Sequence, residues 1–402
     1  MSKIQDYTGY TEKDTPTKMT VAASVITIAG LDDDEELYLT KDFTASYYDD
    51  DYAMRGEFNV SATTGSEIVY LWALCNTVDE IGALITADTD LHCLSWENGK
   101  LVLTERNGAS STTDTSSTTF SEDTDYWYRV VRDEDVGTNG TLYAYFYTDA
   151  QCMDFVEMIS VTLTENANFQ YQYAVSGKGD GGGGVSITLT ISNLINEDLP
   201  YTLKDIRTRV RDILNEDTAD FWSDAQLTRL INDAEREIAI KAMCIQHIDS
   251  LSTSASTRVV AYSGYRCMFL EHLISTTEGL GLRKILPLNA GRQWEEGSTP
   301  QKWYESGSNI CIEPILVATS NLNAYVVDYP AQEMSNNPDL PSIPPAYRPL
   351  IILYTLAQAI KKEKRFSQSA HLKSVFEAEL MHTRYDKSEI IPDSYEKIDY
   401  GR

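Results

Sequence analysis

The chain of 402 residues has little positive charge, almost no proline in its first half and no long apolar run. Its 33 Lys and Arg stand against 61 Asp and Glu, a formal charge of −28 at pH 7. That balance argues against general binding to DNA, RNA or anionic lipid, which require a basic footprint. No stretch of about 18 apolar residues occurs, so no membrane span is expected. The polar N-terminus, MSKIQDYTGYTEKD, predicts neither a signal peptide nor an anchor.

The sequence also lacks the spacings that hold metals or build active sites. Its six cysteines form no Cys-x-x-Cys pair, and its five histidines do not cluster with them. Scattered cysteines without a signal peptide indicate buried free thiols in a reducing compartment. The glycine-rich stretch Gly177–Gly184 is no P-loop, because Ser or Thr does not follow its Lys and a strand, not a helix, comes next. Without a nominated carboxylate pair or a Ser/His/Asp signature, we expect no enzyme activity and no catalytic, cofactor-binding or metal-ligating residue.

Proline divides the sequence. Only Pro16 precedes residue 200, and the other eleven prolines lie at Pro200 or beyond. The first half has strand-like patterns, and the second has helical patterns with a strand-rich insert. We therefore expect a multidomain α+β chain, since 402 residues exceed one typical core.

Short segments of period two fill the first half. In Val185–Ile191 apolar residues alternate with Ser and Thr, and Leu142, Ala144 and Phe146 alternate with tyrosines. Asn-Gly pairs favour tight hairpins, because their central residues need positive φ. The sequence therefore predicts an antiparallel β-sandwich over residues 20–197, after a flexible segment 1–19. The Ser/Thr-rich stretch Ser110–Thr119 is expected to be a loop.

This half resembles the concanavalin-like, laminin-G-type sandwich, a jelly-roll, in Asp125–Asp133, in Gly140–Tyr145 and in a last strand that closes on Asn193 and Leu194. The resemblance implies carbohydrate binding, sometimes with calcium. The acidic runs Asp32–Glu36 and Asp49–Asp51 lack the spacing of a calcium loop, so solvated loops are the better interpretation. Three tryptophans are either sugar platforms or, more commonly in sandwiches, core residues: Trp72, Trp96 and Trp127.

Two capped amphipathic helices open the second half, within Tyr201–Ile240. Thr202 is the N-cap candidate of the first helix, with Asp205 three residues later, and Ser223 with Gln226 forms a capping box for the second. Phe221 and Trp222 stand where a hydrophobic staple would pack. The apolar stripes of the two helices are Leu203, Ile206, Val210, Ile213 and Leu214, and then Leu227, Leu230, Ile231, Ala234 and Ile238.

Beyond these helices the chain becomes strand-like, and a small antiparallel insert is expected at about 284–330. An extended Pro-rich link leads into an apolar helix at Tyr347–Lys362, which ends in basic residues that suit a helix C-terminus. A last amphipathic helix is predicted at Ser367–Tyr385, with Leu372, Val375, Phe376, Leu380 and Met381 as its stripe. Residues 386–402 are expected to form an extended tail.

In this order, the second half resembles the head-to-tail adaptor (connector) proteins of tailed bacteriophages. The residues that carry the resemblance are Phe221–Leu227, Leu230–Ala234, Val326–Pro330, Pro338–Pro341, Tyr347–Leu350 and Leu356-Ala357. The resemblance covers about residues 200–390, within a predicted adaptor domain at 198–385. It implies a non-enzymatic virion protein at the head–tail junction, assembled in the host cytoplasm. The large sandwich departs from the minimal adaptor, which is mostly helical.

The resemblance further implies a ring, commonly twelve-fold, that joins portal to tail or nozzle proteins and lines the DNA ejection channel. An acidic lumen would let genomic DNA pass without sequence-specific binding. The sandwich, on the ring periphery, would be free to bind capsid, fibre or glycan. Two alternatives remain open. One is a carbohydrate-binding or carbohydrate-cleaving tail or fibre-attachment protein, and the other is a bacterial protein whose helices match by coincidence.

Overall fold

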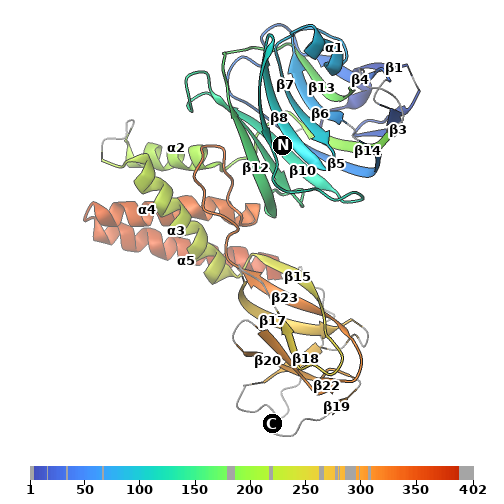
Figure 1. Cartoon of the computed structure of the whole chain (residues 1–402). Helices are drawn as coiled ribbons and strands as arrows, with labels where there is room; N and C mark the ends of the chain where they lie inside the picture. Colours follow the sequence, from blue (N-terminus) through green and yellow to red (C-terminus); the bar gives the residue numbers. More distant parts are fainter. Residues whose placement is uncertain are drawn as a thin grey trace. The chain divides into compact units, whose positions relative to one another are not determined.

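The computed structural model divides the chain into two compact units, Met1–Pro200 and Tyr201–Arg402 (Figure 1). It describes residues 4–15, 17–32, 35–65, 68–178, 186–216, 221–261, 267–276, 279, 281–285, 296–297, 299–306 and 309–388. The expected boundary, between residues 197 and 198, lies three residues before the observed division. The first unit is built from antiparallel sheets, and the long helices come later in the chain.

The first unit contains two seven-stranded sheets. The first sheet has the order β1 (Thr11–Asp14), β4 (Leu37–Asp42), β13 (Tyr171–Gly177), β6 (Ile68–Cys75), β7 (Leu91–Glu97), β8 (Lys100–Asn107) and β9 (Ser110–Thr115). The second has the order β12 (Phe155–Thr162), β11 (Thr141–Tyr147), β10 (Tyr126–Asp133), β5 (Tyr52–Thr64), β14 (Ser186–Ile195), β3 (Val25–Asp32) and β2 (Met19–Val21). A single turn of 3₁₀-helix, η1 (Tyr7–Gly9), and a short helix, α1 (Ile81–Thr86), complete the unit.

The alternating sequence pattern explains how these sheets pack. Leu142, Ala144 and Phe146 of β11 point into one apolar core, to which strands of both sheets contribute. Tight turns fix the register, as predicted: Asn98 and Gly99 both have positive φ, 51° and 76°, in the β7–β8 hairpin. A second, smaller cluster joins Ile81 and Leu84 of α1 to apolar side chains of the first sheet.

The N-terminal segment differs from the expected flexible stretch 1–19, because β1 pairs with β4 and Met19 begins β2. Backbone bonds also anchor it, since Gln5 N donates to Leu194 O at 2.8 Å and Leu194 N donates to the Tyr7 hydroxyl at 3.2 Å.

One further expectation for this unit is corrected. The predicted loop Ser110–Thr119 contains the edge strand β9, whose side chains are mostly exposed. Backbone hydrogen bonds to β8 hold this polar strand in the sheet. Its side chains remain mostly exposed, so the sequence shows no apolar face. The tyrosines that alternate with the apolar residues of β11 are buried as well: Tyr143, Tyr145 and Tyr147.

Four helices form the body of the second unit: α2 (Leu203–Leu214), α3 (Asp224–Ala242), α4 (Arg348–Lys362) and α5 (Phe366–Ser388), with the short η3 (Pro345–Tyr347) before α4. Most of the predicted stripe residues meet in one core. Three do not: Ile213 is 60% exposed, Met381 is 48% exposed, and Val375 is half-buried outside that core. Ile213 and Met381 each lie at or next to the C-terminal end of their stripe. Residues 386–388 of the expected tail belong to α5, and the rest of the tail lies outside the described residues.

The strand insert is larger than predicted and begins earlier. A seven-stranded sheet has the order β15 (Gln246–Ser252), β23 (Asn321–Asp328), β17 (Cys267–Ser275), β18 (Gly281–Lys284), β20 (Lys302–Ser306), β21 (Asn309–Glu313) and β16 (Val259–Ala261). A two-stranded sheet pairs β19 (Glu296–Gly297) with β22 (Ile315–Leu316). The expected bounds, 284–330, therefore miss β15 to β18.

The insert is also not wholly antiparallel, because β18 runs parallel to β20 and β19 runs parallel to β22. Its first and last strands pair with each other, with Gln246 opposite Val327, and Asp328 N donates to Ile245 O at 2.9 Å. The chain therefore enters and leaves the insert at one place.

Candidate functional site: the Trp222 node and the Asp339 loop

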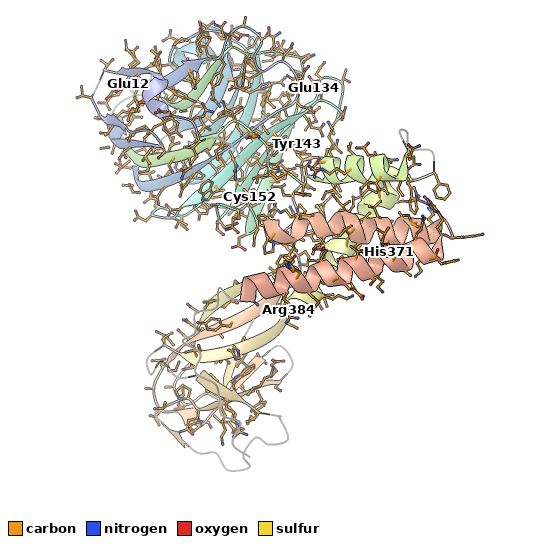
Figure 2. All side chains as sticks on the ribbon, turned by 180° about the vertical axis from the view of Figure 1, so that it is seen from behind. Glu12, Glu134, Tyr143, Cys152, His371 and Arg384 are labelled. Carbon is orange, nitrogen blue, oxygen red and sulfur yellow. The ribbon has the colours of Figure 1, made fainter. Side chains whose placement is uncertain are left out.

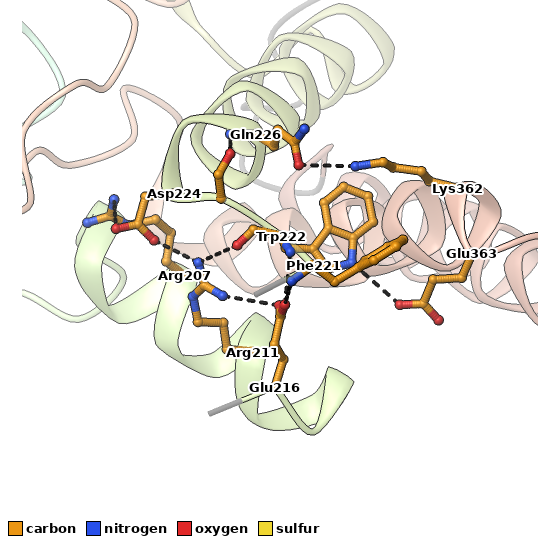
Figure 3. Close-up of polar contacts among 10 residues, drawn as sticks. Arg207, Arg211, Glu216, Phe221, Trp222, Asp224, Gln226, Lys362 and Glu363 are labelled. Atoms are coloured by element: carbon orange, nitrogen blue, oxygen red, sulfur yellow. Dashed lines mark hydrogen bonds and ion pairs between the residues drawn. The ribbon is translucent and has the colours of Figure 1, made fainter. Parts of the chain in front are cut away.

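The first part of the site is a cluster around Trp222, which we call the Trp222 node. It joins the end of α2, the start of α3 and the end of α4 (Figure 3). Trp222 is 3% exposed and lies in the helical core. The Lys362 ammonium lies 3.9 Å from the centroid of the indole, and the indole Nε1 donates to Glu363 Oε1 at 3.4 Å. A buried indole under a cation joins apolar packing to cation–π attraction, so this residue ties two helices together.

Glu216 and Arg211 hold the backbone on which Trp222 sits. Glu216 Oε1 accepts from the backbone N–H groups of Phe221 and Trp222 at 2.6 and 2.8 Å. Arg211 donates to Glu216 Oε2 at 3.1 Å, to the Trp222 carbonyl at 2.7 Å and to Asp224 Oδ1 at 2.7 Å. These charged bonds fix the backbone that leads into α3, through Arg211 of α2 and through Glu216, which follows the C-cap of α2.

The start of α3 follows the prediction in part. Ser223 is the N-cap, and its hydroxyl accepts from Gln226 N at 3.3 Å. The reciprocal half of the capping box is replaced, because Gln226 Oε1 accepts from Lys362 Nζ at 3.0 Å instead. The predicted staple is also divided: Trp222 packs, whereas Phe221 is 55% exposed.

The second part of the site is the loop of residues 334–342, which we call the Asp339 loop. Asp339 folds it, because its Oδ2 accepts from the backbone N–H groups of Ser335 and Asn336 at 2.6 and 2.7 Å. The loop then caps α2: Leu203 N donates to Asp339 O at 2.9 Å, and Lys204 N donates to Asn337 O at 3.0 Å. Two N–H groups that lack partners within α2 are thereby satisfied.

Helix α3 holds the other side of the Asp339 loop through Asn232 and Glu235. The Asn232 amide exchanges two bonds with the backbone of Met334, at 2.9 and 3.0 Å. Glu235, 1% exposed, accepts from Ser342 N at 2.5 Å. Burial raises the pKa of the Glu235 carboxyl to about 8, and the nearby buried Arg348 only partly offsets this.

Together, the Trp222 node and the Asp339 loop bring the separate adaptor-like motifs of the second unit into contact. The stretch Phe221–Leu227 meets α2 and α4, whereas Leu230–Ala234 meets the loop that contains Pro338–Pro341. The bonds found here hold backbone and helices in place, and none presents a polarised nucleophile. Across the described ranges, no three His, Cys, Asp or Glu side chains gather to hold a metal.

Of the three tryptophan candidates in the sandwich, Trp72 of β6 and Trp96 of the paired strand β7 belong to one apolar core, whereas Trp127 lies on β10 in the second sheet. Trp72 and Trp96 are core residues, 0% and 1% exposed, and Trp127 is half-buried. Asp32 begins the acidic run Asp32–Glu36, of which residues 33 and 34 lie outside the described residues, and it pairs with Lys18 at 3.3 Å. Five cysteines are free thiols, four of them buried.

Sequence reasoning missed several residues of the site. The sequence does not single out Glu216, and it predicts Lys362 only as a basic residue at a helix C-terminus. Glu235 carries no sequence signal of burial, since it is one carboxylate among 61 acidic residues. Its place three and four residues from Ile238 and Ile231, which are both buried, was the one available hint.

Comparison with known proteins finds a family model that matches the second unit. Residues 201–386 match the family model described as SU10 adaptor protein. The predicted resemblance of this half to adaptors is thereby confirmed, and it supports a structural adaptor role and a place in the virion. None of the curated proteins matches the chain.

Several solved structures are similar to about half of the chain. The VIP36 exoplasmic/lumenal domain, in a Ca²⁺/Man3GlcNAc-bound form, shares 13% identity over 50% of this chain and 90% of that chain, with a TM-score of 0.32. Basic winged bean lectin with Tn-antigen shares 7% over 48% and 96%, with a TM-score of 0.32. The endo-β-1,4-glucuronan lyase of the fungus Trichoderma reesei shares 11% over 48% and 89%, with a TM-score of 0.31. These weak likenesses assign no ligand or activity to the chain.

Of the helices in the described residues, none has both the length and the apolar character needed to cross a membrane.

Proposed function

We propose that this protein is a ring subunit of the head-to-tail connector of a tailed bacteriophage, which joins the portal to tail or nozzle proteins around a channel for DNA. The observation that carries the proposal is the match of residues 201–386 to the SU10 adaptor family. Three of the predicted adaptor-like stretches, Phe221–Leu227, Leu230–Ala234 and Pro338–Pro341, lie at the Trp222 node and the Asp339 loop, which supports one rigid helical body.

A rigid body suits a subunit that closes a ring, because small changes in its shape would accumulate around the circle. Charged and buried bonds hold α2, α3 and α4 to one another at both parts of the site. The net charge of −28 supports a channel through which DNA phosphates slide without binding. The twelve-fold number and the absence of enzyme activity remain predictions from the family resemblance.

The sandwich has its own proposed role as an accessory domain on the ring periphery that contacts capsid, fibre or glycan. The competing function, a carbohydrate-binding tail or fibre-attachment protein, needs exposed aromatic platforms. Trp72 and Trp96 are buried, which leaves only Trp127 of the three candidates partly accessible. The burial of two candidates favours the connector over a sugar-binding protein.

The test is electron microscopy of the purified full chain with its portal, and of virions. We expect a ring on the portal vertex, with the sandwiches outside the helical bodies. A solitary chain in the presence of portal, or a trimeric fibre distant from the capsid vertex, would overturn the proposal. Glycan-array binding without ring formation would favour the carbohydrate-binding protein instead.

A further inference from the structure

A cationic turn stands out in this acidic chain. Residues 361–365, KKEKR, connect α4 to α5 and carry four basic side chains against the single acid Glu363. Four of the 33 basic residues of the chain thus lie within five positions. We call this segment, with the aromatic rings of Phe221 and Phe366 beside it, the basic–aromatic turn.

The aromatic rings beside this turn are exposed. Phe366, the first residue of α5, is 63% exposed, and Phe221 is 55% exposed. Lys362 Nζ lies 5.1 Å from the centroid of the Phe221 ring, which places that ring against the turn. Exposed phenylalanines cost free energy in water, so two of them beside one cationic turn indicate a surface that is covered in the working assembly.

Two of the four basic side chains of the turn have partners within the chain. Lys362 is engaged with Trp222 and Gln226, and Arg365 lies 3.4 Å from Glu363. Among the described residues, no ion pair joins Lys361 or Lys364 to a carboxylate, and both side chains are exposed. The turn therefore has positive charge available for an acidic partner.

The chain contains a segment of complementary composition. Residues 389–402, EIIPDSYEKIDYGR, carry four acidic residues against two basic ones, together with three isoleucines and two tyrosines. The apolar side chains suit the two phenylalanines, and the carboxylates suit Lys361 and Lys364. The Ile391-Pro392 step favours an extended backbone, which is the form that lays side chains along a surface.

Length and direction favour the turn of another copy. Helix α5 has 23 residues, so at 1.5 Å per residue it separates the basic–aromatic turn from the start of this segment by about 35 Å. Figure 2 shows His371 and Arg384 towards the two ends of α5, with the turn beyond His371. Fourteen extended residues span at most about 46 Å, but to reach its own turn the segment would have to double back along the whole helix. A second copy placed ahead of α5 needs no reversal.

We propose that residues 389–402 of one copy bind the basic–aromatic turn of a second copy of this chain. This contact deepens the proposed connector function and rests on it, because it supplies a link between neighbouring subunits.

The test uses the full chain with Tyr395 replaced by the photo-crosslinking residue p-benzoylphenylalanine. Heavy-isotope and light-isotope copies are mixed, assembled with portal and irradiated, and the crosslinked peptides are identified by mass spectrometry. We expect crosslinks to the peptide around Phe366, with mixed isotope labels. Raising NaCl from about 0.1 to about 0.5 M should reduce their yield severalfold, because salt screens exposed charges.

Charge reversal supplies the matched comparison. Lys361→Glu with Lys364→Glu should lower the crosslink yield at least about fivefold, since attractive pairs at an exposed site become repulsive ones. Lys302→Glu with Lys373→Glu, the same change at two exposed lysines elsewhere in this unit, should change it less than about twofold. Equal losses in the two variants would overturn the proposal.

The other outcomes are also decisive. Crosslinks from residue 395 to its own copy, to the portal or to another surface would show that residues 389–402 do not bind the basic–aromatic turn of a second copy. If DNA protects the turn and residue 395 gives no crosslinks, the basic side chains of the turn bind DNA phosphates and not residues 389–402. A ring that forms without the crosslink would refute this contact and leave the connector function standing, whereas a chain that neither assembles nor crosslinks would refute both.

Discussion

Trp222 and Phe221 are neighbours in the sequence with opposite surroundings, and they give a direct test of the node. Trp222→Ala removes a buried indole and the cation–π contact with Lys362, so we expect it to lower the free energy of unfolding by about 3 kcal/mol. Phe221→Ala should cost less than about 1 kcal/mol, because its ring is already 55% exposed. Urea unfolding followed by helical circular dichroism measures both. Equal losses in the two variants would show that the Trp222 node does not stabilise the helices.

Glu235 gives a pH dependence of known sign. Its pKa is raised from 4.5 to about 8, so between these pH values the folded chain holds a proton that the unfolded chain releases. The free energy of unfolding should therefore fall as pH rises through this window and level off above it. Glu235→Gln keeps an acceptor for Ser342 N without the charge. At pH 9 we expect it to be more stable than the parent by on the order of 1–4 kcal/mol, and near pH 4 the two should agree.

Urea unfolding at a series of pH values measures this difference. Glu237→Gln, a change on the same helix at a half-buried residue paired with Lys241, is the control and should retain the slope of the parent. If Glu235→Gln follows the parent at every pH, then Glu235 is not the group that binds the proton.

At this scale the sequence predicts the caps and much of the helical stripes. Thr202 and Ser223 are predictable because an N-cap depends only on residues within three positions of it. Lys362 and Gln226 are 136 positions apart, so their bond depends on tertiary packing that a local pattern does not encode. For the same reason, the Gln226 side chain leaves the expected capping box.

At the scale of single elements, α2 depends on the cap at its start and on the Asp339 loop. Thr202→Ala removes the side-chain oxygen that accepts from Asp205 N, so we expect a loss of about 1 kcal/mol in the free energy of unfolding. Thr208→Ala, on the exposed face of the same helix, should be neutral or slightly stabilising because Ala favours helix. Thermal unfolding of both variants checks this. A loss at Thr208 as large as that at Thr202 would contradict the role of the cap.

The element scale also shows why the insert was underestimated. β15, QHIDSLS, alternates exposed and half-buried residues and buries none of them, so its sequence lacks the apolar face of a typical strand. It pairs along its whole length with β23, whose apolar residues make β23 easy to predict. β9 was missed for the same reason, since the Ser and Thr of an exposed edge strand resemble those of a loop.

At the scale of the molecule, the insert should be removable. Because Gln246 pairs with Val327, opposite ends of the insert lie about 5 Å apart, the usual separation of paired residues in antiparallel strands. Replacing residues 246–327 by a short Gly-Ser linker should therefore leave α2 to α5 folded. Circular dichroism should show retained helix and a cooperative thermal transition. A molten helical unit after the deletion would show that the sheet is required for the helices to pack.

The division into two halves was predictable from the whole sequence, because proline distribution and periodicity change together near residue 200. The pairing of the strands was not, since order within a sheet depends on contacts between distant segments. The first sheet places β13 between β4 and β6, more than 90 residues earlier in the chain.

The bond from Gln5 N to Leu194 O has a further consequence for the sandwich, because it brings the two ends of that unit together. A domain whose ends meet can be reopened elsewhere and rejoined across its old termini without crossing its core. The β7–β8 hairpin at Asn98-Gly99 offers such a place for circular permutation. For the same reason, a domain with adjacent termini can be inserted within another chain at a single site.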